Sequence, residues 1–561
     1  TYKLPNGTCT SPLVPHTSYE YDTLLNSDGT SSPMTGLAVT TFANSTWSGQ
    51  PTNVATGLGP NYTTLSNDWT TSGPPEAVNT SGTQLVDGFS LSLTGEIIFP
   101  AVGTWTMTVT GDDSASLYID DTLIATSAGS AVSGSYVIPV GTTLTHRIRV
   151  THSEVSGNAK LAAQWSGPGV STQAIPTSAL RPRYSLQTRA TVDDSSADAP
   201  AQVSHTEYSA TGIDPALGLA TRVTVDPRNT RLTTTTTFET AGLRRRTART
   251  LPGGNQTTYD YYSSGASASV DVPCTAANDT TVNQGQRLRK ATDPTGANGN
   301  AVISESVYDV WGRVVATRAG YRNSGVDNWD ASWTCTAFDD RGRTTSVAIP
   351  ARGAQPARTV YTDYSVSGNP LVIQTCDNAN GVVTINSDLL GRAVQSVDVW
   401  SKTTTSTFDQ TTGRLTSTSG PEGAQGFSYD RAGKITQQSL DGNVVAVPSY
   451  LAAGNANEFQ LGSVGYPSGV GNTGNGTSGT LSYNTNGQVV GLAWTQSNSS
   501  PLTSNTVTRA QSGRILDDAI DGTDAFSGGN NYRYDTAGRL VTARMSGGIV
   551  YQYNYVASGR C

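Results

Sequence analysis

Two adjacent aspartates offer the clearest candidate chemistry in this sequence. Asp112 and Asp113 lie between stretches in which apolar and polar residues alternate. Carboxylate oxygens are hard ligands that suit Ca²⁺, and a bound Ca²⁺ can accept two adjacent hydroxyl groups as further ligands. The alternative is that the pair only caps the turn between two strands. The neighbouring acids Asp120 and Asp121 fit a hairpin turn better than a metal site.

No catalytic constellation is recognisable. The four histidines are His16, His146, His152 and His205. His146 occupies an alternating strand position, and His152-Ser153-Glu154 is no triad, because triads are defined by spatial geometry. Nucleophile-elbow, phosphate-loop and zinc-protease motifs are absent from the sequence. The pair Asp517-Asp518 would suit glycoside hydrolysis only at a workable separation, and aspartates in turns are the default interpretation. We therefore expect no catalysis in this segment.

The elements around the aspartate pair are predicted to be strands. Apolar and polar residues alternate at 89–93, 105–109 and 144–150. Alternation of period two indicates strands with one buried face, and many short strands separated by turns are typical of a β-sandwich. The pair then lies where one such strand ends and the next begins.

Three phrases in this region resemble the PA-fourteen domain, the β-sandwich named from anthrax protective antigen. They are Ala101-Val102-Gly103-Thr104-Trp105, the stretch 110–121, and Leu161-Ala162-Ala163-Gln164-Trp165-Ser166-Gly167-Pro168. The resemblance covers residues 36–183. It implies that Asp112 and Asp113 match the paired aspartates that hold calcium, and through it sugar hydroxyls, in sugar-binding members. Those members also use an Asn or Asp on a later loop, for which Asn158 is the candidate by position.

A second pattern recurs through the rest of the chain: an aromatic residue, an acid, two variable positions and Gly-Arg. Such self-similarity indicates an array of supersecondary units. Its clearest copies are Tyr308-Asp309 with Gly312-Arg313, Phe338-Asp339 with Gly342-Arg343, Tyr429-Asp430 with Gly433-Lys434, and Tyr534-Asp535 with Gly538-Arg539.

Each copy predicts a strand, a tight turn and another strand. Aspartate at the first position and glycine at the fourth are preferred in type I turns. A single copy is too small to bury its own face, so we expect stacked copies to share one apolar face with the aromatic residues inward. These acids and arginines are therefore interpreted as structural.

The repeated phrase resembles the YD-repeat family, also called Rhs repeats, of bacterial toxins and teneurins. The resemblance covers residues 206–561 and implies a large β-sheet that spirals into a hollow shell or barrel, often around a toxic C-terminal segment. The stretch Asp293-Pro294-Thr295-Gly296 is similar to the motif that ends such shells, but further repeats follow it, so we interpret it as a turn.

The predicted fold class is therefore all-β, in four parts. Residues 1–35 are expected to form an N-terminal extension, 36–183 the sandwich, 184–205 a linker and 206–561 the repeat shell. The chain begins with Thr1 and its last residues repeat the motif offset, so we expect a piece of a longer protein.

The amino-acid composition disfavours several classes of binding partner and cofactor. The net charge is −8 and only 14% of residues are charged, which disfavours nucleic acid as a partner. No apolar run is long enough to span a membrane. The five cysteines are widely spaced, without a C-x-x-C pair, so zinc or thioredoxin-like chemistry is not expected. Their odd number leaves at least one thiol free or paired outside the chain.

The leading expectation is a secreted or cell-surface bacterial protein. Its YD-repeat shell would enclose or display a downstream effector outside this chain, and its sandwich would bind a glycan or a cell-wall or cell-surface ligand, with Ca²⁺ as cofactor. One alternative is a calcium-dependent, lectin-like adhesin with the array as a rigid scaffold. Another is the accessory and scaffold part of a carbohydrate-active enzyme.

Overall fold

The computed structural model describes most of the chain. It covers residues 17–58, 62–79, 81–192, 196–208, 217–240, 242–265, 269–270, 273, 281–455 and 457–555. Secondary structure there is almost entirely β, with single 3₁₀ turns at η1 (Thr177–Ala179), η3 (Val366–Gly368) and η4 (Ser546–Gly548). None of the described residues forms a helix long and apolar enough to cross a membrane. The predicted all-β fold class is confirmed.

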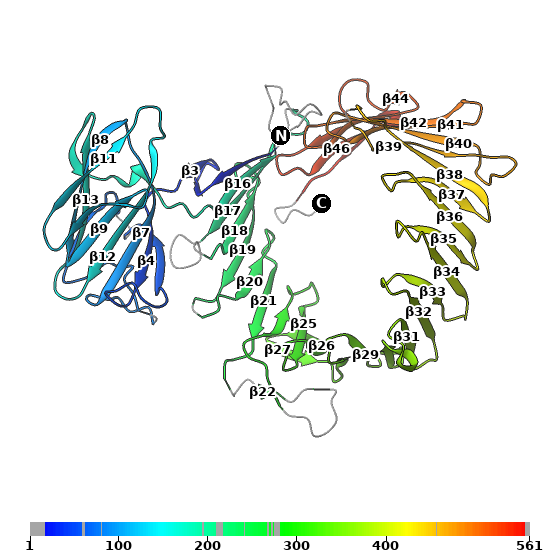
Figure 1. The fold of residues 1–561 in the computed structure, drawn as a ribbon, viewed down its shortest axis with the longest axis horizontal. Helices are drawn as coiled ribbons and strands as arrows, with labels where there is room; N and C mark the ends of the chain where they lie inside the picture. The colour runs from blue at the N-terminus through cyan, green and yellow to red at the C-terminus, as the bar shows by residue number, and fades with distance from the viewer. Residues whose placement is uncertain are drawn as a thin grey trace.

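A two-layered sandwich occupies the N-terminal third (Figure 1). One sheet has the order β10-β9-β12-β7-β4-β5, with β15 also paired to β7, and the other has the order β11-β8-β13-β14, with β6 also paired to β13. The strands of the first are β4 (Ala38–Phe42), β5 (Asn53–Thr56), β7 (Phe89–Ile98), β9 (Ser114–Ile119), β10 (Thr122–Ser127), β12 (Thr145–Glu154) and β15 (Leu180–Arg181). Those of the second are β6 (Ser66–Thr70), β8 (Gly103–Asp112), β11 (Val132–Ile138), β13 (Ala159–Gly167) and β14 (Val170–Ala174).

The apolar core of the sandwich lies between its two sheets. Alternating residues of β8, including Trp105 and Met107, face alternating residues of β9 such as Leu117, and all three are fully buried. Trp105 also packs against Trp165, with ring centroids 5.1 Å apart. Burial of this apolar face stabilises the sandwich by the hydrophobic effect.

A second, much larger antiparallel sheet contains the repeats. Within the described residues it has 28 strands, which pair in chain order after β1. They are β1 (Thr17–Tyr21), β16 (Gln187–Val192), β17 (Gln202–Tyr208), β18 (Ala220–Val225), β19 (Leu232–Phe238), β20 (Arg246–Thr250), β21 (Gln256–Tyr261), β24 (Leu288–Thr292), β25 (Asn300–Tyr308), β26 (Val314–Asn323), β27 (Val326–Trp329), β28 (Thr334–Phe338), β29 (Thr344–Ile349), β30 (Arg358–Asp363), β31 (Val372–Asp377), β32 (Val382–Ser387), β33 (Ala393–Val397), β34 (Thr403–Phe408), β35 (Leu415–Gly420), β36 (Gly423–Tyr429), β37 (Ile435–Leu440), β38 (Asn443–Tyr450), β39 (Leu461–Tyr466), β40 (Thr477–Tyr483), β41 (Val489–Gln496), β42 (Pro501–Arg509), β43 (Ile515–Ile520) and β44 (Thr523–Asp524). Smaller sheets are formed by β2 (Thr23–Leu25) with β3 (Ser31–Pro33), by β22 (Ser269–Val270) with β23 (Val282–Asn283), and by β45 (Tyr532–Tyr534), β46 (Leu540–Met545) and β47 (Ile549–Gln552).

The segments expected to be an extension and a linker contribute strands to this sheet. β1, from the predicted extension 1–35, pairs antiparallel with β16, from the predicted linker 184–205. β16 then pairs with β17. The polar composition of these segments suggested connections, but in a sheet with exposed faces polar strands are stable. The sandwich is thus inserted between two neighbouring strands of the large sheet. The acidic residues 193–195 of the predicted linker lie outside the described residues.

The expectation that stacked repeats bury one continuous apolar face is wrong. Most positions in the repeat strands are half-buried or exposed, as in β35 and β37. Among the described residues, the array holds only two small apolar clusters, one around Ala510 and Leu516 and one around Val307. The physical reason is that the array is a single layer (Figure 1), so no second layer covers either face.

The large sheet bends round until its two ends meet (Figure 1). Its terminal strands β1 and β44 do not pair with each other, so the ring is not a closed barrel. Instead, the backbone N–H of Tyr534 donates to the carbonyl of Asp198 at 2.7 Å. Arg533 forms an ion pair with the Asp198 carboxylate, and Asn530 donates to it at 3.0 Å. We call these contacts the ring latch.

Candidate functional site

Asp112 and Asp113 lie where the chain crosses from one sheet of the sandwich to the other. Asp112 ends β8 and Asp113 precedes β9, and the peptide bond between them is cis. Gly111 permits this tight crossing, because a Cβ there would lie 2.4 Å from that of Ala115. Both aspartates are half-buried at one end of the sandwich.

Asp113 also fixes a neighbouring loop. Its Oδ2 accepts hydrogen bonds from the backbone N–H groups of Val155 at 2.7 Å and Ser156 at 3.3 Å. Asp87 accepts another from Gly157 at 2.8 Å. Asp113 thus binds the loop that follows β12, and not the backbone of its own crossing between β8 and β9. Among the described residues, no hydrogen bond or ion pair engages the side chain of Asp112.

Asn158 belongs to this same loop. It is exposed and lies between β12 and β13, and Lys160, two residues later, pairs with Asp112 across β13 and β8. The Lys160 ammonium group points elsewhere, to Asp68 at 3.0 Å. The fold thus brings Asp112, Asp113 and Asn158 to one end of the sandwich. Within the described ranges, no three acidic, imidazole or thiol side chains form a ready-made metal cage.

Sequence reasoning missed one acid at this end. Glu154 ends β12 and is fully buried, and neither carboxylate oxygen has a hydrogen-bond partner. Burial, followed by the charges of Asp113, Asp112 and Asp87, raises the pKa of Glu154 to about 7. The sequence alternation could have indicated this residue, because Glu154 occupies an inward position of β12, as do Ile148 and Val150.

The histidines of β12 are packing residues. His152 is fully buried, its Nδ1 lies 3.0 Å from the carbonyl of Ser114, and its ring contacts Trp69 and Phe89. Burial lowers the pKa of His152 to about 4, so the ring is neutral near pH 7. His146 is held by Asp120 at 2.7 Å.

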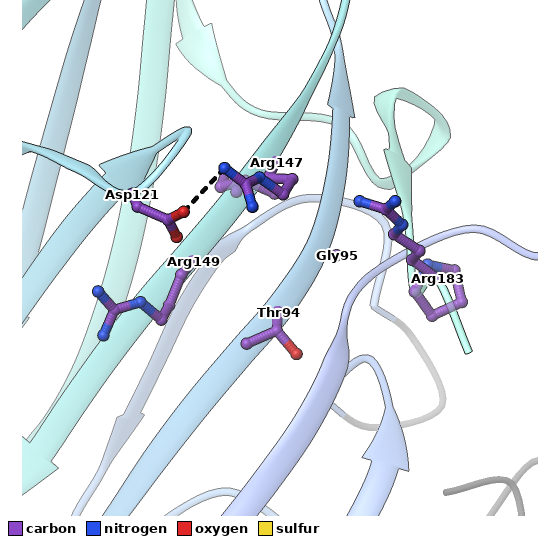
Figure 2. A pocket seen from close by; sticks show the side chains of 8 residues that line it. Thr94, Gly95, Asp121, Arg147, Arg149 and Arg183 are labelled. Atoms are coloured by element: carbon purple, nitrogen blue, oxygen red, sulfur yellow. Dashed lines mark ion pairs between the residues drawn. The ribbon is translucent and has the colours of Figure 1, made fainter. Parts of the chain in front are cut away.

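A depression of about 230 Å³ lies over β7 and β12 (Figure 2). Arg147, Arg149 and Arg183 line it. Arg147 already forms an ion pair with Asp121 at 2.8 Å, and Arg183 lies 3.3 Å from Glu96. Arg149 is stacked 3.8 Å from the ring centre of Tyr118. Because these cations are engaged, this depression is a weaker candidate than the aspartate end.

The repeated phrase forms the predicted tight turn. In the copy at Asp339, the N–H of Gly342 donates to the Asp339 carbonyl at 2.9 Å, and Gly342 has a φ of 80°. The guanidinium of Arg343 contacts the Asp339 carboxylate at 2.7 Å. The backbone N–H of Arg343, and then its side chain, hold the pKa of Asp339 below its ordinary value. The same ion pair recurs at Asp309–Arg313, Asp388–Arg392 and Asp535–Arg539.

Side-chain contacts also join each repeat to the next one. The Arg343 guanidinium lies 4.2 Å from the ring centre of Tyr364, and the Tyr364 hydroxyl donates to the carbonyl of Thr344 at 3.0 Å. Equivalent hydroxyl bonds join Tyr308 to Leu288, Tyr429 to Leu415, Tyr450 to Ile435, Tyr483 to Leu461 and Tyr534 to Ile515. We call this series the tyrosine–arginine ladder. The tyrosines and arginines of the repeated phrase therefore have a structural role.

Comparison with known families supports the assignment of the sandwich. Residues 34–179 match the model of the PA14 domain. The sandwich predicted at 36–183 therefore contains a PA14 domain. A search of curated proteins found no match.

Solved structures with similar folds are distant. An anti-sigma factor domain-containing protein from Clostridium clariflavum is 21% identical, with 26% of this chain and 48% of that chain covered and a TM-score of 0.22. A TcdB2-TccC3-Cdc42 structure is 12% identical, with 71% and 23% covered and a TM-score of 0.34. A PA14 sugar-binding domain from an RTX adhesin is 14% identical, with 26% and 98% covered and a TM-score of 0.20. This chain thus spans less than half the length of the first two. Similarities at this level carry no information on what it binds.

Proposed function

We propose that this chain is part of a secreted or cell-surface bacterial protein in which a calcium-dependent glycan-binding sandwich is attached to a YD-repeat shell. The observation that carries the proposal is the convergence of Asp112, Asp113 and the loop bearing Asn158 at one end of the PA14 domain. The Asp112 carboxylate makes no hydrogen bond or ion pair among the described residues, which leaves its oxygens available to a cation.

In this proposal Asp112, Asp113 and Asn158 hold the ion through side-chain oxygens. Ca²⁺ supplies open coordination positions that two adjacent sugar hydroxyls can fill. The chain's own contribution is positioning. The N–H groups of Val155 and Ser156 hold one Asp113 oxygen in place, and Gly111 allows the crossing that sets the two aspartates side by side.

The binding proposal is tested by glycan-array binding of the full chain with and without chelator. Asp112→Ala is expected to abolish binding, because it removes a ligand whose side chain makes no hydrogen bond or ion pair among the described residues. Asp121→Ala is the matched control, since Asp121 only pairs with Arg147 on the sandwich surface. Chelator-insensitive binding, or full binding by Asp112→Ala, would reject a calcium-mediated mechanism.

The shell part of the proposal is supported by the ring and its latch, a form suited to enclosing or displaying an effector encoded beyond this chain. A secreted setting is consistent with Cys335, which is disulfide-bonded, because such bonds persist in oxidising compartments. Sequencing the gene past Cys561 tests whether an effector is encoded there. An effector-like continuation is expected, and an immediate stop codon would remove the cargo from the proposal.

A lectin-like adhesin with the array as rigid scaffold is the second candidate. The attachment of the sandwich favours it, because β1 and β16 hold both of its ends in adjacent strands. Adhesion of cells that display the full chain distinguishes the two. Calcium-dependent adhesion without any effector activity would favour the adhesin.

A further inference from the structure

The positive charge of the sandwich is gathered on one face. Residues 36–183 contain nine acidic residues but only five basic ones. The basic residues are Lys160, Arg147, Arg149, Arg181 and Arg183. Arg147 of β12 and Arg181 of β15 lie directly opposite Glu96 of β7, one on each side. Arg183 forms an ion pair with Glu96, and Arg149 occupies the next outward position of β12, because side chains alternate along a strand. We call the four arginines the arginine face.

Two adjoining depressions lie over the arginine face. The first, of about 230 Å³, is lined by Arg147, Arg149 and Arg183 around Thr94 (Figure 2). The second, of about 460 Å³, shares Arg183 and adds Arg181. Residues of β1, β2 and β3 also line the second depression, so it continues toward the large sheet. A ligand with more than one unit can therefore contact both depressions.

Arg149 holds hydrogen-bond donors that the described residues do not use. Its guanidinium stacks on the ring of Tyr118, 3.8 Å from the ring centre, and no acidic residue among those described forms an ion pair with it. Stacking fixes the plane of the guanidinium and leaves the N–H groups at its edge able to donate to a ligand. The exposed Thr94 lies directly opposite on β7, so its hydroxyl can donate to the same ligand.

The other ion pairs of the arginine face are exchangeable. Arg147 pairs with Asp121, and its side chain is more than half exposed. Arg183 pairs with Glu96, and its side chain is also more than half exposed. Exposed ion pairs contribute little to stability, and a guanidinium has five N–H donors, so each of these arginines can also bind an external anion.

The remaining acids beside the arginine face are engaged by other groups. Asp22 lines the second depression, and the backbone N–H groups of Ser185 and Leu186 donate to its two carboxylate oxygens. Asp120 is held by His146 at 2.7 Å. The arginine face therefore attracts anions although the sandwich as a whole is acidic.

We propose that the arginine face binds the carboxylate groups of an acidic saccharide. A planar guanidinium matches a carboxylate through two parallel hydrogen bonds. The smaller depression lies below the roughly 300 to 1,000 Å³ of pockets that enclose a whole drug-sized ligand, so it suits one sugar unit of a longer saccharide. Nucleic acid is disfavoured, because the chain carries a net charge of −8.

This inference takes from the proposed function only that the ligand is a saccharide. Its site is separate from the aspartate pair, because Ser153, which pairs with Ser114 beside the aspartate crossing, lies four residues after Arg149. At about 3.3 Å per residue, the backbone separation along β12 is about 13 Å. Binding at the arginine face is therefore expected to need no Ca²⁺.

The test is calorimetric titration of the full chain, in the presence of chelator, with tetrasaccharides of galacturonate and of mannuronate. The methyl esters of the same tetrasaccharides keep the sugar and lose the charge. The acids are expected to bind about ten- to one hundred-fold more tightly than the esters, because only the acids accept charge-assisted hydrogen bonds. Binding of the acids is expected to weaken as NaCl is raised from about 50 mM to about 500 mM, because exposed charges are screened.

Three charge variants locate the binding site. Arg149→Gln is expected to weaken binding of the acidic tetrasaccharides about ten-fold. Glu96→Gln releases Arg183 from its ion pair and is expected to strengthen binding. Lys160→Gln is the matched control, because it removes the one basic residue of the sandwich outside the arginine face, which pairs with Asp68 on the other sheet. Arg183→Gln, at an exposed side chain, repeats the test if Arg149→Gln does not fold.

The outcomes separate this inference from the proposed function. No binding of either acidic tetrasaccharide, equal binding of acids and esters, or an equal loss in Lys160→Gln would overturn the inference. A single-stranded oligothymidylate of equal charge that binds as tightly as the acids would also overturn it, by showing a general polyanion surface. If the acids bind with chelator present and no glycan binds through Ca²⁺, the inference stands and the calcium-mediated proposal fails. Calcium-dependent glycan binding that Arg149→Gln and Arg183→Gln leave unchanged would support the proposed function and reject the inference.

Discussion

His205 is a buried histidine in the first part of the array. It lies in β17 opposite Arg189 of β16, is fully buried, and neither ring nitrogen has a partner. Burial and then the charge of Arg189, partly opposed by Glu20, lower its pKa to about 4. The ordinary value for histidine is about 6.5, so the folded chain holds this ring neutral.

From the lowered pKa of His205 we predict that the free energy of unfolding depends on pH. The unfolded chain gains a proton on His205 as pH falls below its ordinary pKa, while the folded chain does not until about pH 4. The contribution of His205 to the free energy of unfolding is therefore fully present above pH 6.5, and about 3 kcal/mol is lost as pH falls to about 4. Urea unfolding at several pH values should show a shallower dependence for His205→Gln than for the unaltered chain. Identical slopes would contradict the prediction, and the comparison cancels all other titrating groups.

At the residue scale, sequence reasoning named part of the candidate site. Asp112 and Asp113 stood out as adjacent acids between alternating strands, and the fold places Asn158 on a loop tied to Asp113. Glu154 could not be assigned in this way, because its importance depends on which acids the fold gathers around it. That arrangement comes from β8, β9 and β12 meeting, which no local pattern encodes.

The strands of the array are joined by side chains as well as by backbone. The tyrosine–arginine ladder joins each turn to the strand of the repeat before it, and it compensates for the missing second layer. Cation–π contacts of this kind contribute about 0.5 to 1 kcal/mol each at exposed sites, and a hydrogen bond contributes a similar amount. The contribution becomes substantial only because it is repeated along the sheet.

One rung of the ladder can be measured by a double-mutant cycle. Tyr364→Phe should cost about 1 kcal/mol, because it removes the hydroxyl bond to Thr344 and keeps the ring. Arg343→Leu combined with Tyr364→Leu should reveal a coupling of about 0.5 to 1 kcal/mol in denaturant unfolding. The same substitutions at Arg341 and Tyr364 provide the control, since Arg341 is an exposed turn residue. Strict additivity for the Arg343 pair would contradict the ladder.

At the element scale, sequence reasoning predicted the turns correctly and the packing wrongly. Aspartate and glycine at fixed offsets determine a turn locally, so the pattern was sufficient there. Whether Tyr429 or Tyr483 packs into an apolar core depends on a second layer being present. The sequence pattern of one strand does not report that, and these tyrosines instead extend along the sheet to neighbouring carbonyl groups.

At the scale of the whole molecule, the contacts of the ring latch hold the two ends of the large sheet together. Asp198 accepts the side-chain contacts of Asn530 and Arg533, and its carbonyl accepts the N–H of Tyr534. A further contact joins Thr536 to Asp226 at 2.7 Å. No strand pairing spans the junction among the described residues. These polar contacts, a bond from Arg514 to the carbonyl of Pro200 and an apolar cluster of Ala199, Ala510 and Leu516 close the ring there.

Asp198→Ala is therefore expected to open the ring without unfolding its strands. Small-angle scattering should show a larger radius of gyration, while the circular dichroism of the β-structure stays unchanged. The opening follows from losing an ion pair and a charge-assisted hydrogen bond, each worth up to a few kcal/mol. Asp340→Ala, at an exposed turn position elsewhere on the ring, is the control. An unchanged radius would show that the remaining contacts suffice.

The chain order of the large sheet also has a consequence for folding. From β16 to β44 almost every strand pairs with the strand before it and the strand after it. Such local pairing costs little loop-closure entropy, so the array can form progressively as the chain emerges from a ribosome or a secretion pore. The bond between Asp198 and Arg533 spans 335 residues and must form late. Until then the partly formed ring presents an open gap through which a following segment of chain can enter.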